Sequence, residues 1–129
     1  MTEPSAKEII SRYESGLKID LDEHSSGRVV LRPVGVLALG DTSALLRERI
    51  GELAKRRDLK RVVLDMGGVR YVDSSGIAVM VSGSTALRKN GIDLVLAQLT
   101  KKVHDLLQVT KLYTVFKVYD SVEQALSQN

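Results

Sequence analysis

The sequence contains no cysteine and no tryptophan, and among its 129 residues only two are proline and one is phenylalanine. Without cysteine the chain has no disulfide framework, no thiolate nucleophile and no cysteine-ligated metal. The shortage of aromatic side chains argues against a platform on which nucleobases stack. No run approaches the roughly 20 apolar residues that span a bilayer, and the first residues lack the apolar core of a signal peptide. We therefore expect a cytoplasmic protein with no segment inserted in a membrane.

Charge is nearly balanced, with 19 Lys and Arg against 16 Asp and Glu and a formal net charge of +3. Both signs are mixed along most of the chain, so composition gives little support to a nucleic-acid partner. The most basic cluster, 55–57 with Lys60 and Arg61, is able to face phosphate or an acidic protein surface. Since a helix dipole favours cations at its end in any case, a solvated helix end is the simpler interpretation.

The order of apolar patterns predicts one α/β domain. Alternation in 17–22 is typical of a strand with one solvated face, and 28–39 forms a hairpin with it. Buried strands and helices then alternate, with strands at 61–66, 93–97 and 115–119 and helices near 42–57, 77–89, 100–107 and 121–126. The predicted order is β-β-α-β-α-β-α-β-α, a four- to five-stranded mixed, mostly parallel sheet with about four helices.

Residues 1–16 carry a separate short helical pattern. The expected organisation is therefore an N-terminal extension, 1–16, followed by one domain, 17–129. Inside the second predicted helix, Gly83 costs about 1 kcal/mol against alanine. A packing contact too close for a side chain would explain that glycine.

The hexapeptide Tyr71-Val72-Asp73-Ser74-Ser75-Gly76 separates a strand-like run from a helix-like run. It places two hydroxyls beside a carboxylate at the expected start of a helix. In the simplest interpretation it is a capping sequence, in which a side-chain oxygen accepts from a free backbone N–H. Capping needs only one such residue, however, and here three stand in a row. The glycine that follows leaves the backbone open to a partner or to a phosphoryl group.

Known enzyme motifs are missing from the chain. It has no Gly-x-x-x-x-Gly-Lys, no Gly-x-Gly-x-x-Gly and no His-Glu-x-x-His. Asp73 and Ser74 with His24 or His104 would supply the residue types of a hydrolase triad. The local sequence does not fit, because a nucleophile elbow has glycine two residues before and two after the serine, and Val72 stands at the first position. We predict that both histidines are ordinary surface residues and that the protein is not an enzyme.

Metal binding would depend on carboxylates, since the only two histidines are distant in sequence. Asp65 and Asp73 flank the Gly67-Gly68 break, and both are expected near the carboxyl ends of parallel strands, where sites in α/β sheets gather. A Mg²⁺ ion is a conceivable ligand there. The simpler roles are a strand end for Asp65 and a helix cap for Asp73, so we predict no metal and no cofactor.

The stretches Val62-Val63-Leu64-Asp65, 69–80 and Gly91-Ile92-Asp93-Leu94-Val95-Leu96 resemble the STAS domain of bacterial anti-sigma-factor antagonists. The 69–80 stretch includes the Asp-Ser-Ser-Gly motif in a strand-loop-helix setting, and 103–112 and 116–126 also fit the family pattern. The resemblance covers roughly residues 17 to 127.

The resemblance implies a non-enzymatic switch protein of bacterial sigma-factor and stress-response regulation. In this family the unmodified antagonist binds an anti-sigma factor, which is also a serine kinase of the histidine-kinase-like ATPase fold, and so frees the sigma factor. The kinase then phosphorylates the first serine of the motif, here Ser74, with Ser75 as the alternative, and a PP2C-type phosphatase restores it. The implied partner-binding residues are Asp73, Ser74, Ser75, Gly76, Ile77, Asp41 and Thr42.

One departure from the family pattern concerns an acid near the phosphorylatable serine. In much of the family the second strand ends in Gly-x-Leu-Asp, whereas the matching run here is Gly35-Val36-Leu37-Ala38. Asp41 stands three residues later and would be a substitute, although its simpler role is N-cap of the first helix.

Two other functions remain open from the sequence. STAS domains also occur as scaffold subunits of stress-sensing assemblies and as accessory parts of membrane transport systems, and the extension and the missing acid favour that hypothesis. The third hypothesis is a small nucleotide-binding or hydrolytic enzyme acting at residues 72–78.

Overall fold

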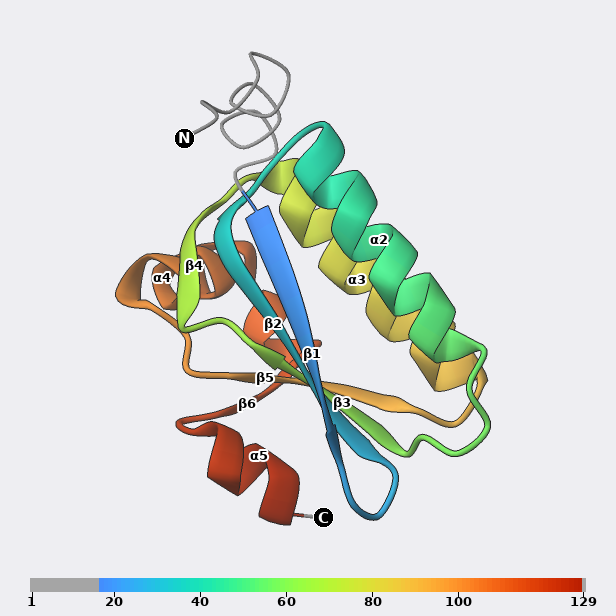
Figure 1. Cartoon of the computed structure of the whole chain (residues 1–129). Coiled ribbons are helices and arrows are strands. Elements are labelled where there is room, and N and C mark those ends of the chain that lie inside the picture. The colour runs from blue at the N-terminus through green and yellow to red at the C-terminus, as the bar shows by residue number, and fades with distance from the viewer. Residues whose placement is uncertain (1–16, 129) are drawn as a thin grey trace, which may run out of the picture.

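The computed structural model describes residues 17–128, and the helical pattern predicted in 1–16 lies outside the described residues. The described elements, shown in Figure 1, are β1 (Leu17–His24), β2 (Arg28–Leu37), α2 (Asp41–Ala54), β3 (Arg61–Asp65), β4 (Gly68–Val72), α3 (Ser74–Lys89), β5 (Asp93–Ala97), α4 (Lys101–Thr110), the 3₁₀ turn η1 (Leu112–Thr114), β6 (Lys117–Tyr119) and α5 (Val122–Ser127). They confirm the predicted α/β class, the opening hairpin and four helices. No helix within 17–128 has the length and apolarity needed to cross a membrane.

The sheet is mixed and mostly parallel, with the order β1-β2-β3-β5-β6. Only β1 and β2 are antiparallel, and the other pairs are parallel. A sixth strand, β4, also pairs with β2, so the prediction of four to five strands was short by one.

Strand β4 exists because β2 is long enough to serve two partners. The first half of β2, residues 28–31, pairs with β3, and the second half, 34–37, pairs with β4. Met66 and Gly67 connect β3 to β4, and the turn is closed by a hydrogen bond in which the Val69 N–H donates to the Met66 carbonyl at 3.1 Å. This connection carries the chain to the start of α3.

Helices cover the two faces of the sheet unequally. The larger apolar cluster joins the strands to α2, α3 and α4, and the smaller one joins Val30, Val63, Val95 and Ala97 to Ala125 of α5. Strand residues alternate between the clusters, as the period of two requires. Figure 1 shows α2 and α3 lying side by side, with α5 apart from them near the C-terminus.

Gly83 lies where α2 and α3 pack together. A Cβ placed on it would stand 2.8 Å from Cδ1 and 3.1 Å from Cγ2 of Ile50. The close contact expected for this glycine is therefore confirmed.

Arg61 fastens the last helix to the sheet. Its side chain is buried, and its guanidinium donates to the carbonyls of Ala125 at 2.9 Å and Gln128 at 2.6 Å and pairs with Asp93 at 3.1 Å. It belongs to the basic cluster predicted to be a solvated helix end, and that interpretation was wrong for this residue. As the first residue of a central strand, Arg61 points beneath α5 instead of into solvent.

Candidate functional site at the start of helix α3

The Asp73 carboxylate joins the start of α3 to the end of β2. As N-cap of α3, it accepts from the Gly76 N–H through Oδ1 at 3.0 Å, and its Oδ2 accepts from the Leu39 N–H at 3.0 Å. The Asp73 N–H in turn donates to the Leu37 carbonyl at 3.1 Å. The predicted capping role of Asp73 is confirmed, and one side chain also fixes the chain that leaves β2.

These hydrogen bonds keep Asp73 charged. The Gly76 N–H has the largest effect and lowers the pKa of the carboxyl below its ordinary value, with further lowering from the N–H groups of Leu39 and Ser75. Partial burial opposes this effect without cancelling it. The loop therefore carries one fixed negative charge at neutral pH.

Gly76 stands where α3 is pressed against β2 and β4. A Cβ at this position would lie 2.4 Å from the Leu37 carbonyl oxygen, 2.8 Å from Leu37 Cγ and 2.9 Å from Val72 Cγ1. Two of these neighbours are buried core side chains and one is backbone, so no flexible group can move aside. From the sequence, this glycine was expected to leave the backbone open to a partner. In the structure it allows α3 to pack closely on Leu37 and Val72.

The two serines differ in their surroundings. Ser74 is the first residue of α3 and is exposed, whereas Ser75 is half-buried. Ile77, also expected at the partner surface, is half-buried and packs against the core. Ser74 is therefore the more accessible hydroxyl of the pair.

Two exposed apolar residues belong to the segments that meet at this loop, and sequence reasoning missed one of them. Leu39, whose N–H binds Asp73, is 79% exposed, and Tyr71 on β4 is 53% exposed. A leucine at the irregular end of β2 was assigned to the strand, and the strand ends two residues before it. Only the hydrogen bond to Asp73 shows that Leu39 belongs to this site.

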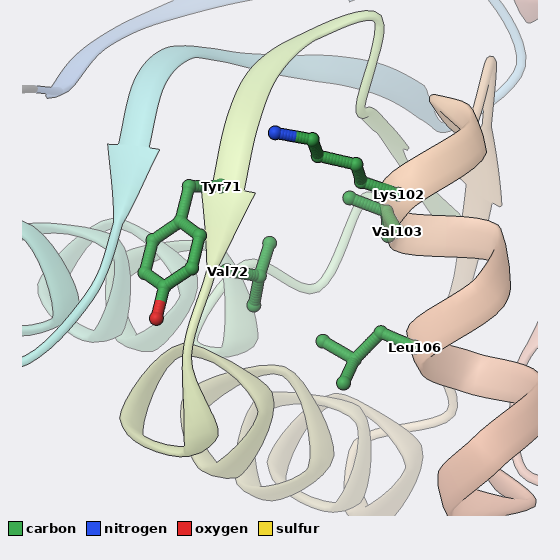
Figure 2. A pocket seen from close by; sticks show the side chains of 5 residues that line it. All are labelled: Tyr71, Val72, Lys102, Val103 and Leu106. Atoms are coloured by element: carbon green, nitrogen blue, oxygen red, sulfur yellow. The ribbon is translucent and has the colours of Figure 1, made fainter.

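A small pocket opens beside the loop, between β4 and α4. It has a volume of about 250 Å³ and is lined by Tyr71, Val72, Lys102, Val103 and Leu106 (Figure 2). The two halves of its wall are thirty residues apart in sequence, so no local pattern indicates it.

The turn between β2 and α2 differs from the prediction. The N-cap of α2 is Gly40, with φ of 101° and without a side-chain cap hydrogen bond, so the N-cap role expected for Asp41 was wrong. Glycine tolerates this left-handed backbone, which lets the helix begin one residue early. The Ser43 hydroxyl donates to the carbonyl of Ala38 and secures the turn. The side chains of Asp41 and Thr42 lie outside the described part of the structure.

The residues considered for a hydrolase triad or a metal site are not brought together within residues 17–128. His24 ends β1 and His104 lies on α4, both are exposed, and neither bonds to Ser74. Asp65 is buried and accepts from Arg32 Nε and from the Gly67 N–H, both at 3.0 Å. Within residues 17–128 no three His, Asp or Glu side chains form a group able to hold a metal ion.

Comparison with known proteins gives consistent matches to this fold. The anti-sigma F factor antagonist of Paenibacillus polymyxa is 28% identical over 112 residues, which cover 87% of this chain and 94% of that protein. The phosphorylated form of SpoIIAA, a Bacillus cell fate determinant, has a TM-score of 0.67 at 16% identity, covering 86% of this chain and 98% of that one. Murine Slc26a9, an anion transporter, has a TM-score of 0.70 at 20% identity, covering 81% of this chain and 18% of the transporter.

The solved structures establish a shared fold, which covers 98% of the SpoIIAA chain and 18% of the anion transporter. The sequence relative is named as an antagonist of an anti-sigma factor. A family model described as STAS domain matches residues 18–125, nearly the whole of the described structure. The chain therefore belongs to the STAS domain family.

Proposed function

We propose that this protein is an anti-sigma-factor antagonist, a non-enzymatic cytoplasmic regulator whose unmodified form binds an anti-sigma factor and whose binding ends when Ser74 is phosphorylated. The observation that carries the proposal is the exposed hydroxyl of Ser74 at the first position of α3, beside the ionised Asp73. The 28% identity with an anti-sigma F factor antagonist over nearly the full length of both chains supports the same role.

A phosphate at Ser74 would add about −1.5 to −2 charges next to the negative Asp73. A partner that covers this surface would have to desolvate both groups, unless it supplied cations in matching positions. If docking lost about 3 to 4 kcal/mol, the affinity would fall by some hundreds of times. Such a change is large enough to reverse the choice of partner.

The same phosphate is expected to leave the fold intact. The N-terminus of a helix carries about half a positive charge and free N–H groups, which favour an anion. On the inner side of the loop, Asp73 and Gly76 hold the start of α3 against β2 through contacts that do not involve the Ser74 hydroxyl. The modification is therefore expected to alter the surface and not the core.

The direct test incubates the purified protein with ATP and the histidine-kinase-like ATPase that acts as anti-sigma factor in the source bacterium. Mass spectrometry is expected to place one phosphate on Ser74, and calorimetry to show that only the unmodified protein binds the kinase. Ser74→Ala should abolish labelling, and Ser75→Ala is the matched control, which should still be labelled. A PP2C-type phosphatase should then restore binding.

Two results would contradict the proposal. If Ser74 stays unmodified after full exposure to an active kinase, the switch mechanism is wrong. If the unmodified protein binds no anti-sigma factor at all, the scaffold role of STAS domains becomes the better hypothesis.

A further inference from the structure

The pocket between β4 and α4 has the size and lining of a site for one apolar side chain. Its volume of about 250 Å³ exceeds that of any single side chain, and Val72, Val103 and Leu106 supply aliphatic walls. Val72 and Val103 are buried and belong to the core, so the floor is rigid. Tyr71 lies at the edge of the pocket and is half-exposed, and Figure 2 shows its ring on the side of β4 away from α4.

The mouth of this pocket is cationic. Figure 2 shows the Lys102 side chain extending from α4 toward β4. It has no ion-pair partner among residues 17–128, although the neighbouring Lys101 pairs with Asp105 at 3.6 Å. An unpaired cation beside an apolar floor favours an occupant that combines acidic and apolar groups.

The pocket is continuous with the loop that holds Ser74. Val72 lines it and is followed directly by Asp73 and Ser74. A partner that covers Ser74 would therefore lie next to the pocket. Leu39, highly exposed and bound to Asp73 through its backbone N–H, is a further apolar residue near this loop.

From this geometry we propose that the β4–α4 pocket receives an apolar side chain from an acidic segment of the anti-sigma factor, an inference that rests on the proposed function. Val72, Val103 and Leu106 pack around that side chain beside Tyr71, and Lys102 pairs with an acidic residue next to it. The pocket supplies affinity and register, and Ser74 supplies the switch.

The pocket can be tested without the kinase. Full-length protein labelled with ¹⁵N is titrated to millimolar concentration with a capped hexapeptide that has a Leu-Phe pair between acidic residues. Saturable amide shifts are expected at residues 71–72 and 102–106. Two matched peptides, one with lysines for the acids and one with alanines for Leu-Phe, are expected to bind several-fold more weakly. The inference is wrong if no saturable shift occurs there or if the lysine peptide binds equally well.

Lys102→Glu is the decisive variant, and Lys101→Glu is its control. Both place an acid in the first turn of α4, where the helix dipole tolerates it, and both change the net charge equally. Only Lys102 lines the pocket, and the Lys101 side chain is 91% exposed. Lys102→Glu should weaken peptide and kinase binding roughly tenfold, as expected for a reversed rim charge, whereas Lys101→Glu should bind like the wild type.

The outcomes separate this inference from the proposed function. If Ser74 is phosphorylated but Lys102→Glu binds the kinase with wild-type affinity, the pocket is not a binding site for the partner, and the proposed switch at Ser74 is unaffected. If the peptide shifts amide signals at the pocket but no kinase phosphorylates the protein, the pocket is supported as a binding site and the proposed switch is wrong. Equal losses in the Lys101 and Lys102 variants would show a general charge effect and overturn the pocket as a specific site.

Discussion

Replacing Gly76 by alanine tests whether the start of α3 is fixed by packing. In a helix, alanine is ordinarily favoured over glycine by about 1 kcal/mol. The added Cβ would lie 2.4 Å from the Leu37 carbonyl and below 3.0 Å from two core side-chain atoms. Because none of these can move without shifting β2 or β4, we expect α3 to be displaced. Overpacking of this kind costs about 1–3 kcal/mol, so the variant should be destabilised in spite of its better helix propensity.

Gly51 provides the matched control within the same protein. It lies in α2, and a Cβ placed on it would meet nothing within 4 Å. Gly51→Ala should therefore gain roughly 0.4–1 kcal/mol, mainly through the lower entropy of the unfolded chain. The same substitution thus has opposite expected signs at the two positions.

Urea denaturation followed by circular dichroism measures both free energies of unfolding. For a domain of this size, each 1 kcal/mol corresponds to about 4 °C in melting temperature, which gives an independent check. If Gly76→Ala is as stable as the wild type or more stable, the contacts with Leu37 and Val72 do not fix the helix, and the account of the motif glycine is wrong. Loss of stability in Gly51→Ala would instead show that local space is a poor guide in this chain.

Two further predictions concern other contacts of the fold. Asp73→Ala should cost about 1 kcal/mol at neutral pH, the ordinary value of a helix cap. Because the pKa of Asp73 is lowered in the folded state, its charge stabilises the protein above the unfolded pKa of about 3.9, and that contribution is lost as the pH falls through the folded value. The deficit of Asp73→Asn, measured by urea titration, should accordingly shrink below about pH 4, and a deficit independent of pH would refute the charge effect. Arg61→Lys should cost about 2 kcal/mol and speed amide exchange in α5, because an ammonium cannot replace the guanidinium donors to Ala125 and Gln128; unchanged exchange in α5 would contradict this.

The sequence predicts the order of strands and helices well because each central strand is short, apolar and bounded by turn residues. Strand β4 was not predicted from the sequence. Its residues Gly68–Val72 include Arg70 and Tyr71, both exposed, so neither a continuous apolar run nor a clean alternation marks it. The strand is stabilised by pairing with the second half of β2, a contact more than thirty residues away in sequence. Only tertiary structure can supply that information.

Within the site, local chemistry was predictable and long-range contact was not. The cap formed by Asp73 follows from residue type and position at the start of a helical pattern. The hydrogen bond from Leu39, the packing of Gly76 on Leu37 and the pocket shared with α4 all join segments distant in the chain. The Asp41 prediction failed for a local reason, since Gly40 adopts a left-handed conformation that a capping rule based on side chains does not consider.

These distant contacts bear on why a switch would be placed at this position. Asp73 binds Leu39 and Gly76 with its two oxygens, so its carboxylate is already committed when a charge arrives at Ser74. It cannot turn away from a phosphate without releasing β2 or α3, and both charges must therefore remain at the surface. A partner that covers Ser74 would then meet an undiminished negative patch. The rigidity of the loop, more than the number of added charges, is what would make a single phosphate effective.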